Sequence, residues 1–135
     1  MDRSELMLKW TIALLGSAAT YLVGEWSELI SFFLLAIVID YLTGIAASLK
    51  VGNGLSSNVG FWGLAKKGLM ILVVILAHRL DELFGTDVIM VGSIYFYLTN
   101  ELISVTENYG RMGLPLPNKI KDIISILKQK GGDQS

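Results

Sequence analysis

Two acidic side chains lie deep within long runs of apolar residues. Asp40 interrupts the run from 29 to 49, and Glu101, which follows Asn100, interrupts the run from 88 to 106. A charged side chain at the centre of a membrane-spanning helix costs roughly 2.5–3.5 kcal/mol on insertion scales, so it seldom faces lipid. Carboxyl groups in that setting bind protons or cations, line water, or join helices by hydrogen bonds. We therefore take Asp40 and Glu101 as the centre of a candidate functional site.

Small and polar residues accompany both acids at helical spacing, so that each apolar run carries one polar face. Two interpretations of these faces remain open. Either the carboxyls are protonated and hydrogen-bonded within one copy of the chain, or the polar faces meet other copies or line water. The candidate residues are Asp40, Thr43, Gly44, Ser48, Tyr97, Asn100, Glu101, Ser104 and Asn108.

Other kinds of chemistry find little support in the sequence. The chain has no cysteine and one histidine, His78, which argues against disulfides and thiolate metal sites. None of the Ser/His, paired-Asp or HExxH arrangements of hydrolytic enzymes is present. The 11 basic and 12 acidic side chains give a net charge of −1, which offers no positive field to a nucleic acid. We expect a non-enzymatic protein with no catalytic residue, cofactor, metal or nucleic-acid partner.

The elements that must position the two acids are predicted to be helices in a membrane. Of the 135 residues, 53% are hydrophobic and 17% are charged, whereas a soluble domain carries about 25% charged residues. A bilayer core of roughly 30 Å needs about 20 helical residues to cross it. The expected fold is all-α: a polytopic membrane domain, 1–109, with four transmembrane helices at about 10–24, 29–49, 65–84 and 88–106.

The distribution of positive charge predicts the topology, because cytoplasmic loops retain Lys and Arg. The connection between the second and third spans holds Lys50, Lys66 and Lys67, which we interpret as a cytoplasmic basic loop. With both termini cytoplasmic, ten basic side chains lie inside and one, Arg79, lies outside. A three-span alternative, in which the first apolar run lies on the membrane surface, is disfavoured by this count.

Residues 110–135 form a predicted cytoplasmic tail. Two prolines and two glycines in the stretch GRMGLPLP end the fourth helix. Beyond them, Ile120, Ile123, Ile124 and Leu127 have the spacing of one helix face. The pattern predicts an amphipathic helix over 118–130, which either packs on the cytoplasmic ends of the spans or binds a partner or lipid.

Three motifs together resemble those of the toxin-secretion/phage-lysis holins. They are DYLTG at 40–44, GFWGLAKKG at 60–68, and NELISVTENYGRMGLPLP at 100–117, followed by the amphipathic tail. The resemblance implies a phage- or prophage-encoded protein that accumulates in the lipid bilayer of the bacterial cytoplasmic membrane and forms homo-oligomers. The oligomers would open lesions that release a cell-wall-degrading endolysin, or a toxin in some relatives. The family's motif positions here, none of them catalytic, are Asp40, Thr43, Gly44, Lys66, Lys67, Asn100, Glu101, Glu107 and Asn108.

Two other functions remain alternatives. A small proton-coupled multidrug exporter of four spans would use Asp40 or Glu101 to exchange protons for a cation. However, only Tyr41 lies next to Asp40, so the sequence offers no aromatic cage for a lipophilic cation there. A scaffold or regulator of another membrane protein would also self-associate. Since four helices fill their own centre, we expect permeabilisation to be a property of an assembly, which the buried acids drive.

Overall fold

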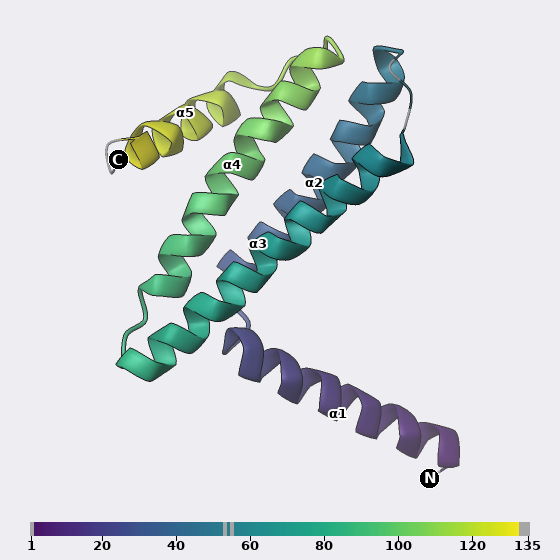
Figure 1. Ribbon diagram of the computed structural model, residues 1–135, viewed down its shortest axis with the longest axis vertical. Helices are drawn as coiled ribbons and strands as arrows, with labels where there is room; N and C mark the ends of the chain where they lie inside the picture. The colour runs from purple at the N-terminus through teal and green to yellow at the C-terminus, as the bar shows by residue number, and fades with distance from the viewer. Residues whose placement is uncertain (1, 53, 55, 133–135) are drawn as a thin grey trace.

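The chain forms five α-helices joined by short connections (Figure 1). The computed structural model describes residues 2–52, 54 and 56–132. Within that part of the chain no strand occurs, so the predicted all-α class is confirmed. The helices are α1 (Arg3–Val23), α2 (Glu28–Lys50), α3 (Ser57–Phe84), α4 (Ile89–Arg111) and α5 (Asn118–Gly132).

A bundle of α2, α3 and α4 carries the candidate site. The helix α4 packs along α2 and against α3, and both contacts are more extensive than the direct contact of α2 with α3. Within a membrane, close packing and polar contacts hold such helices together, because lipid is as apolar as the side chains. The buried apolar cluster of the bundle comprises Ile30, Phe33, Ala36, Ile37, Val74, Ile94 and Leu98.

Three of the described helices, α1, α2 and α3, are long and apolar enough to cross a membrane. The chain is therefore a helical membrane protein. The helix α4 has the same 23-residue length as α2, but it carries more polar residues. It is therefore not among the helices that are apolar enough to cross a membrane by composition alone. The crossing by α4, and with it the count of four spans, stays a prediction.

Two helices begin well before the apolar runs that predicted them. The helix α1 begins at Arg3 rather than at 10, and α3 begins at Ser57 rather than at 65. Lys66 and Lys67 therefore lie inside α3, which corrects their expected place in a connecting loop; Lys50 is the last residue of α2. A span predicted from hydropathy ends at the first charged residues. The backbone hydrogen bonds of a helix, by contrast, continue through charged residues.

A tight corner directs α1 away from the bundle (Figure 1). Among the described helices, α1 contacts α3 alone, and none of its own residues is buried. The Arg79 guanidinium lies 4.2 Å from the centre of the Tyr21 ring. Gly24, with φ of 77°, packs on His78, and a Cβ at Gly24 would lie 2.8 Å from the imidazole Cε1. The backbone conformation therefore favours glycine at this corner, and a side chain here would also have to displace the His78 ring.

The turn between α3 and α4 is fixed by a carboxylate that the sequence analysis did not single out. Asp81, 4% exposed, accepts hydrogen bonds from the backbone N–H groups of Ile89 and Met90, both at 2.9 Å. The Thr86 hydroxyl also donates to it, at 2.6 Å. Asp81 thus satisfies free N–H groups at the start of α4 and sets the antiparallel packing of α3 and α4.

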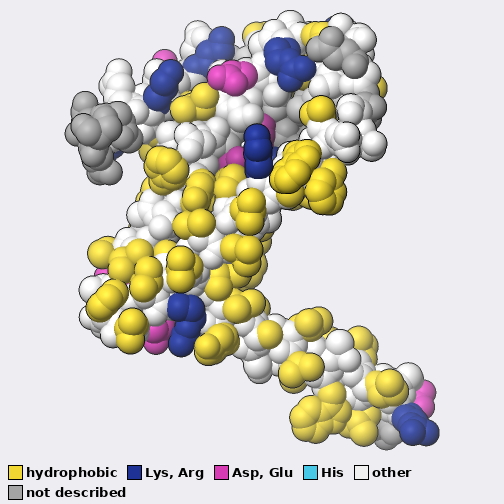
Figure 2. Space-filling model, viewed as in Figure 1, with side chains coloured by type: hydrophobic (Ala, Val, Ile, Leu, Met, Phe, Trp, Pro, Cys, Tyr) yellow, Lys and Arg dark blue, Asp and Glu magenta, His cyan; other side chains and the backbone are white. Residues whose placement is uncertain are grey.

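The helix α5 extends over the predicted amphipathic segment and ends two positions later, at Gly132. It packs against α4 through Ile124, which is 9% exposed. Apolar side chains cover much of the middle and lower part of the visible face and of α1 (Figure 2). Most of the visible basic side chains gather at the opposite end, where α4 ends and α5 lies (Figure 2).

Candidate functional site

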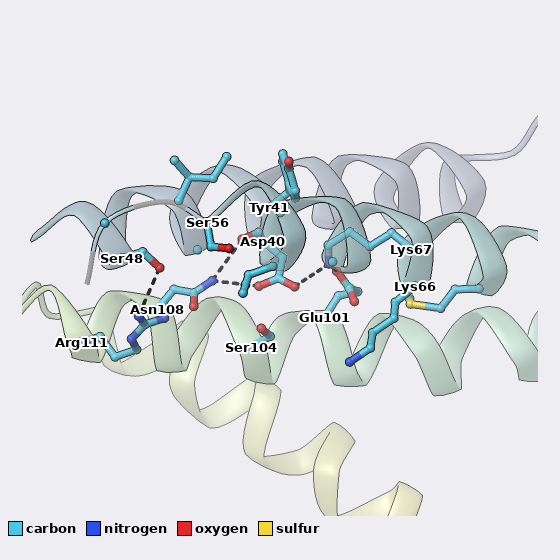
Figure 3. Close-up of a pocket in the computed structure, with 17 residues that line it drawn as sticks. Asp40, Tyr41, Ser48, Ser56, Lys66, Lys67, Glu101, Ser104, Asn108 and Arg111 are labelled. Atoms are coloured by element: carbon cyan, nitrogen blue, oxygen red, sulfur yellow. Dashed lines mark hydrogen bonds and ion pairs between the residues drawn. The ribbon is translucent and has the colours of Figure 1, made fainter. Parts of the chain in front are cut away.

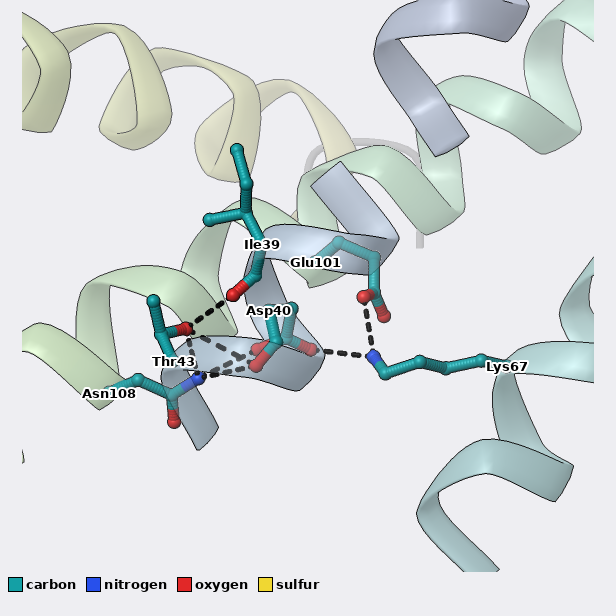
Figure 4. A network of polar contacts seen from close by, with 6 residues as sticks. All are labelled: Ile39, Asp40, Thr43, Lys67, Glu101 and Asn108. Atoms are coloured by element: carbon teal, nitrogen blue, oxygen red, sulfur yellow. Dashed lines mark hydrogen bonds and ion pairs between the residues drawn. The ribbon is translucent and has the colours of Figure 1, made fainter. Parts of the chain in front are cut away.

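A buried ion-pair cluster joins the three helices of the bundle (Figure 4). The Lys67 ammonium on α3 lies 2.7 Å from Asp40 Oδ2 on α2 and 2.6 Å from Glu101 Oε2 on α4. The side chains of Lys67, Asp40 and Glu101 are 12%, 8% and 7% exposed. One lysine thus pairs with both acids that the sequence analysis placed at the centre of the site.

An asparagine completes the cluster from α4. Asn108 Nδ2 donates to Asp40 Oδ1 and to Thr43 Oγ1, both at 2.9 Å, and lies 3.1 Å from the Asp40 carbonyl oxygen (Figure 4). The Thr43 hydroxyl donates back to the carbonyl oxygen of Ile39, at 2.7 Å. Asp40 therefore uses one carboxylate oxygen for Lys67 and the other for Asn108. We infer that this network fixes the register of α2 against α4.

The cluster bears directly on the two interpretations that the sequence left open. In this structure both acids have their partner within one copy of the chain, and that partner is the ammonium group of Lys67. Removing one member of a buried ion pair typically costs 3–5 kcal/mol, because the remaining charge is left unpaired. The acids as placed here are therefore paired within the single bundle, and loss of one partner would leave a buried charge without compensation. They do not need a second copy to be satisfied.

A cavity of about 560 Å³ opens beside the cluster, between α2, α3 and α4 (Figure 3). Its lining includes Asp40, Lys67 and Glu101 of the cluster, together with the exposed residues Lys66 and Arg111. Three cationic and two anionic side chains face this space, so its lining carries a formal excess of one positive charge. Among the described residues, no group of three or more His, Asp and Glu side chains is arranged to hold a metal ion.

Most of the predicted site residues meet at this place. Gly44 faces Asn108, and a Cβ at Gly44 would lie 3.6 Å from the amide nitrogen. Ser104 lines the cavity, as does Ser48, which accepts a long hydrogen bond from Arg111 at 3.5 Å.

Two predicted site residues and one motif position lie elsewhere. Tyr97 packs against the apolar core, with its ring centre 5.3 Å from that of Phe96. Asn100 and Glu107 are exposed. The buried face of α4 differs from the predicted polar face, because apolar and polar residues share it: Ile94, Leu98, Glu101, Val105 and Asn108.

Sequence reasoning missed the partner of the two acids, although a signal for it was present. Lys66 and Lys67 stand next to an apolar run with no acid beside them in the sequence, while two acids lie inside other apolar runs. A buried charge needs a partner of opposite sign, so the unmatched lysines were candidates for that role. Spacing alone does not say which of the two neighbours points inward.

Comparisons with known proteins identify the family of this chain. A model of the bacteriophage holin family matches residues 17–129. An uncharacterized protein of Halalkalibacterium halodurans is 43% identical over 97% of this chain and 98% of its own length. An uncharacterized 14.9 kDa protein in the nagH 3′ region of Clostridium perfringens is 38% identical over 91% of this chain and 94% of its own.

A named phage protein is among the relatives. A probable holin of Bacillus phage phi105 is 32% identical over 112 residues, which cover 82% of each chain. No solved structure matches. The family match extends over α2, α3 and α4, and thus over every member of the buried cluster. This chain, which resembled the holins in its motifs, belongs to the bacteriophage holin family.

Proposed function

We propose that the protein is a holin that oligomerises in the bacterial cytoplasmic membrane and permeabilises it, so that an endolysin or a toxin leaves the cell. The observation that carries this proposal is the family match across residues 17–129, which includes the whole bundle. Three helices apolar enough to cross a membrane support it. The chain would have endolysin as its functional partner and additional copies of itself as its structural partners.

The geometry shifts the expected means of association from the acids to apolar surface. Asp40 and Glu101 are paired with Lys67 inside one bundle, so they offer little to a second copy. The helix α1, by contrast, is apolar along most of its length and has no buried residue. Since helices in lipid associate by close packing, exposed surface of this kind is where copies would meet. The cluster would keep each bundle rigid during assembly.

The proposed topology places both termini in the cytoplasm, which requires α1 to fold back along the bundle from the outward direction that it has in Figure 1. The end of α2, the start of α3 and the end of α4 share one end of the bundle (Figure 1), and Lys50 and Arg111 are there. Cytoplasmic segments retain such side chains. We assign this end to the cytoplasm, with residues 1–109 as the membrane domain and 110–135 as a cytoplasmic tail.

The exporter alternative is less consistent with the charges of the cavity. An exporter of cationic drugs needs a negative site that is free to bind either a proton or the drug. Here both acids are held by Lys67, and Lys66 and Arg111 leave the lining with an excess positive charge. A cationic substrate would be repelled. The holin therefore remains the function that the site supports best.

Expression of the protein alone in bacteria tests the proposal. A cytoplasmic cell-wall hydrolase is co-expressed, and the membrane potential and the hydrolase outside the inner membrane are followed over time. A holin gives an abrupt loss of potential together with release of the hydrolase. A potential that stays intact while the full-length protein accumulates in the membrane would contradict the proposal, and drug resistance in those cells would indicate the exporter.

A further inference from the structure

The helix α5 exposes an apolar stripe that its packing on α4 does not cover. Ile124 faces α4 and is 9% exposed, whereas Ile123 and Ile126 are 55% and 52% exposed. These two residues are three positions apart, so they lie on one side of the helix, which is turned away from Ile124. The bundle therefore leaves about half of each of these two residues without cover from the described chain.

Lysines stand at both ends of this stripe. Lys119 precedes Ile123 by four positions, and Lys130 follows Ile126 by four, so all four side chains follow one another along one line of the helix. Both lysines are exposed. Among the described residues, neither has a carboxylate within ion-pair distance, since both ion pairs in the structure belong to Lys67. The stripe is thus apolar in its middle and positive at each end.

This arrangement fits one kind of surface. An amphipathic helix lies in the headgroup layer with its apolar residues in the acyl boundary, and its lysines extend towards the phosphates. Each basic residue near an anionic surface adds to binding, whereas a second copy of α5 would bring like charges together. The position of α5 beside the end of α4, which belongs to the membrane bundle, places it within reach of a bilayer surface (Figure 1).

We propose that α5 docks on the anionic lipid surface of the membrane through the stripe Lys119, Ile123, Ile126 and Lys130. Ile120, 45% exposed, lies beside the stripe and enters the same layer. The helix then sits with one face on α4 and a different face on phosphate-bearing headgroups. This inference needs only that the chain lies in a membrane, so it stands or falls separately from cell lysis.

Single-cysteine labelling of the full-length protein provides a clean test, because the chain has no native cysteine. A polarity-sensitive fluorophore is attached to Ile126→Cys or, as a matched control, to the neighbouring Ser125→Cys, which lies on another face and is exposed. Each protein is placed in vesicles of phosphatidylcholine alone or of phosphatidylcholine with phosphatidylglycerol. Lipids carrying a spin label in the acyl chain serve as quenchers.

The proposal predicts that the probe at 126 is quenched by spin-labelled lipid in vesicles with phosphatidylglycerol and much less in phosphatidylcholine alone. The probe at 125 stays in water in both. Adding Lys119→Gln and Lys130→Gln to Ile126→Cys is expected to lower the ratio of docked to undocked helix about tenfold or more. Arg3→Gln with Lys9→Gln removes the same charge from α1 and should leave the quenching unchanged.

Three results would overturn the proposal. The first is a probe at 126 that remains in water in both kinds of vesicle. The second is equal quenching in both kinds of vesicle, which would show that anionic lipid contributes nothing to the docking of α5. The third is a probe that is shielded but not quenched by lipid and that cross-links to a second copy, which would identify the stripe as a contact between copies.

Discussion

Lys67 Nζ on α3 lies 2.6 Å from Glu101 Oε2 on α4, although 34 positions separate the two residues in the sequence. The same ammonium group lies 2.7 Å from Asp40 Oδ2 on α2. Three helices therefore meet at one cation. Each helix contributes a charge that would be costly to bury alone, so the three charges specify which faces of the helices must pack together.

Replacing the shared cation should destabilise the bundle more than any other single change in the cluster. Lys67→Gln leaves two carboxylates without their cation, and we expect the free energy of unfolding to fall by about 3–5 kcal/mol. Lys66→Gln is the matched control, because Lys66 is exposed and adjacent. Denaturant-dependent loss of helical circular dichroism in detergent micelles measures both.

A compensating variant separates the effect of charge in the cluster from the effect of side-chain volume. When Asp40→Asn and Glu101→Gln are added to Lys67→Gln, no net charge remains buried and much of the lost stability should return. If the triple variant is no more stable than Lys67→Gln alone, charge pairing is not what holds the three helices together.

Loss of the asparagine that bridges α2 and α4 should have a smaller effect. Asn108→Ala removes the donor to Asp40 Oδ1 and to Thr43, and we expect the free energy of unfolding to fall by about 1–3 kcal/mol. Asn100→Ala changes an exposed residue of the same helix and should have little effect. Equal effects of the two substitutions, measured by the same unfolding assay, would show that the bridge contributes nothing.

The start of α4 depends on a residue outside the polar cluster. Asp81→Ala removes the acceptor for the N–H groups of Ile89 and Met90, so the first turn of α4 should open and the midpoint of thermal unfolding should fall. Glu82→Ala, at the exposed neighbouring position, should leave the midpoint unchanged. Hydrogen exchange at the amides of Ile89 and Met90 should speed up in the first variant, and protection equal to that of the unmodified protein would contradict the capping role.

The corner at Gly24, which joins α1 to α2 and packs on α3, offers a test of how α1 contributes to assembly. Gly24→Ala adds a Cβ that would lie 2.8 Å from His78 in a backbone conformation that alanine rarely adopts. We expect α1 to change its direction, and both oligomer size on native gels and the time of lysis to change. Gly16→Ala adds the same group in mid-helix, where nothing lies within 4 Å. Unchanged oligomers and timing in Gly24→Ala would mean that the corner does not control assembly.

Apolar runs and their spacing predicted much of the fold. The all-α class, the membrane setting and the helices near 29–49, 88–106 and 118–130 follow from periodicity and hydropathy, because each is a local property of the chain. The ends of α1 and α3 were less predictable, since a helix continues past the residues that lipid would accept. Asp81 was overlooked because a capping acid at a helix end resembles an ordinary surface charge until its donors are known.

The amino-acid sequence by itself determined that Asp40 and Glu101 would lie among apolar residues and would need partners. Only the tertiary structure decided that the partner is Lys67, that Lys66 beside it stays exposed, and that Asn100 turns away while Asn108 turns inward. The hydropathy of the neighbouring residues is enough to predict that a charged side chain is buried. Pairing depends on the relative rotation and register of three separate helices, and these are fixed only when the apolar core and the polar cluster form together.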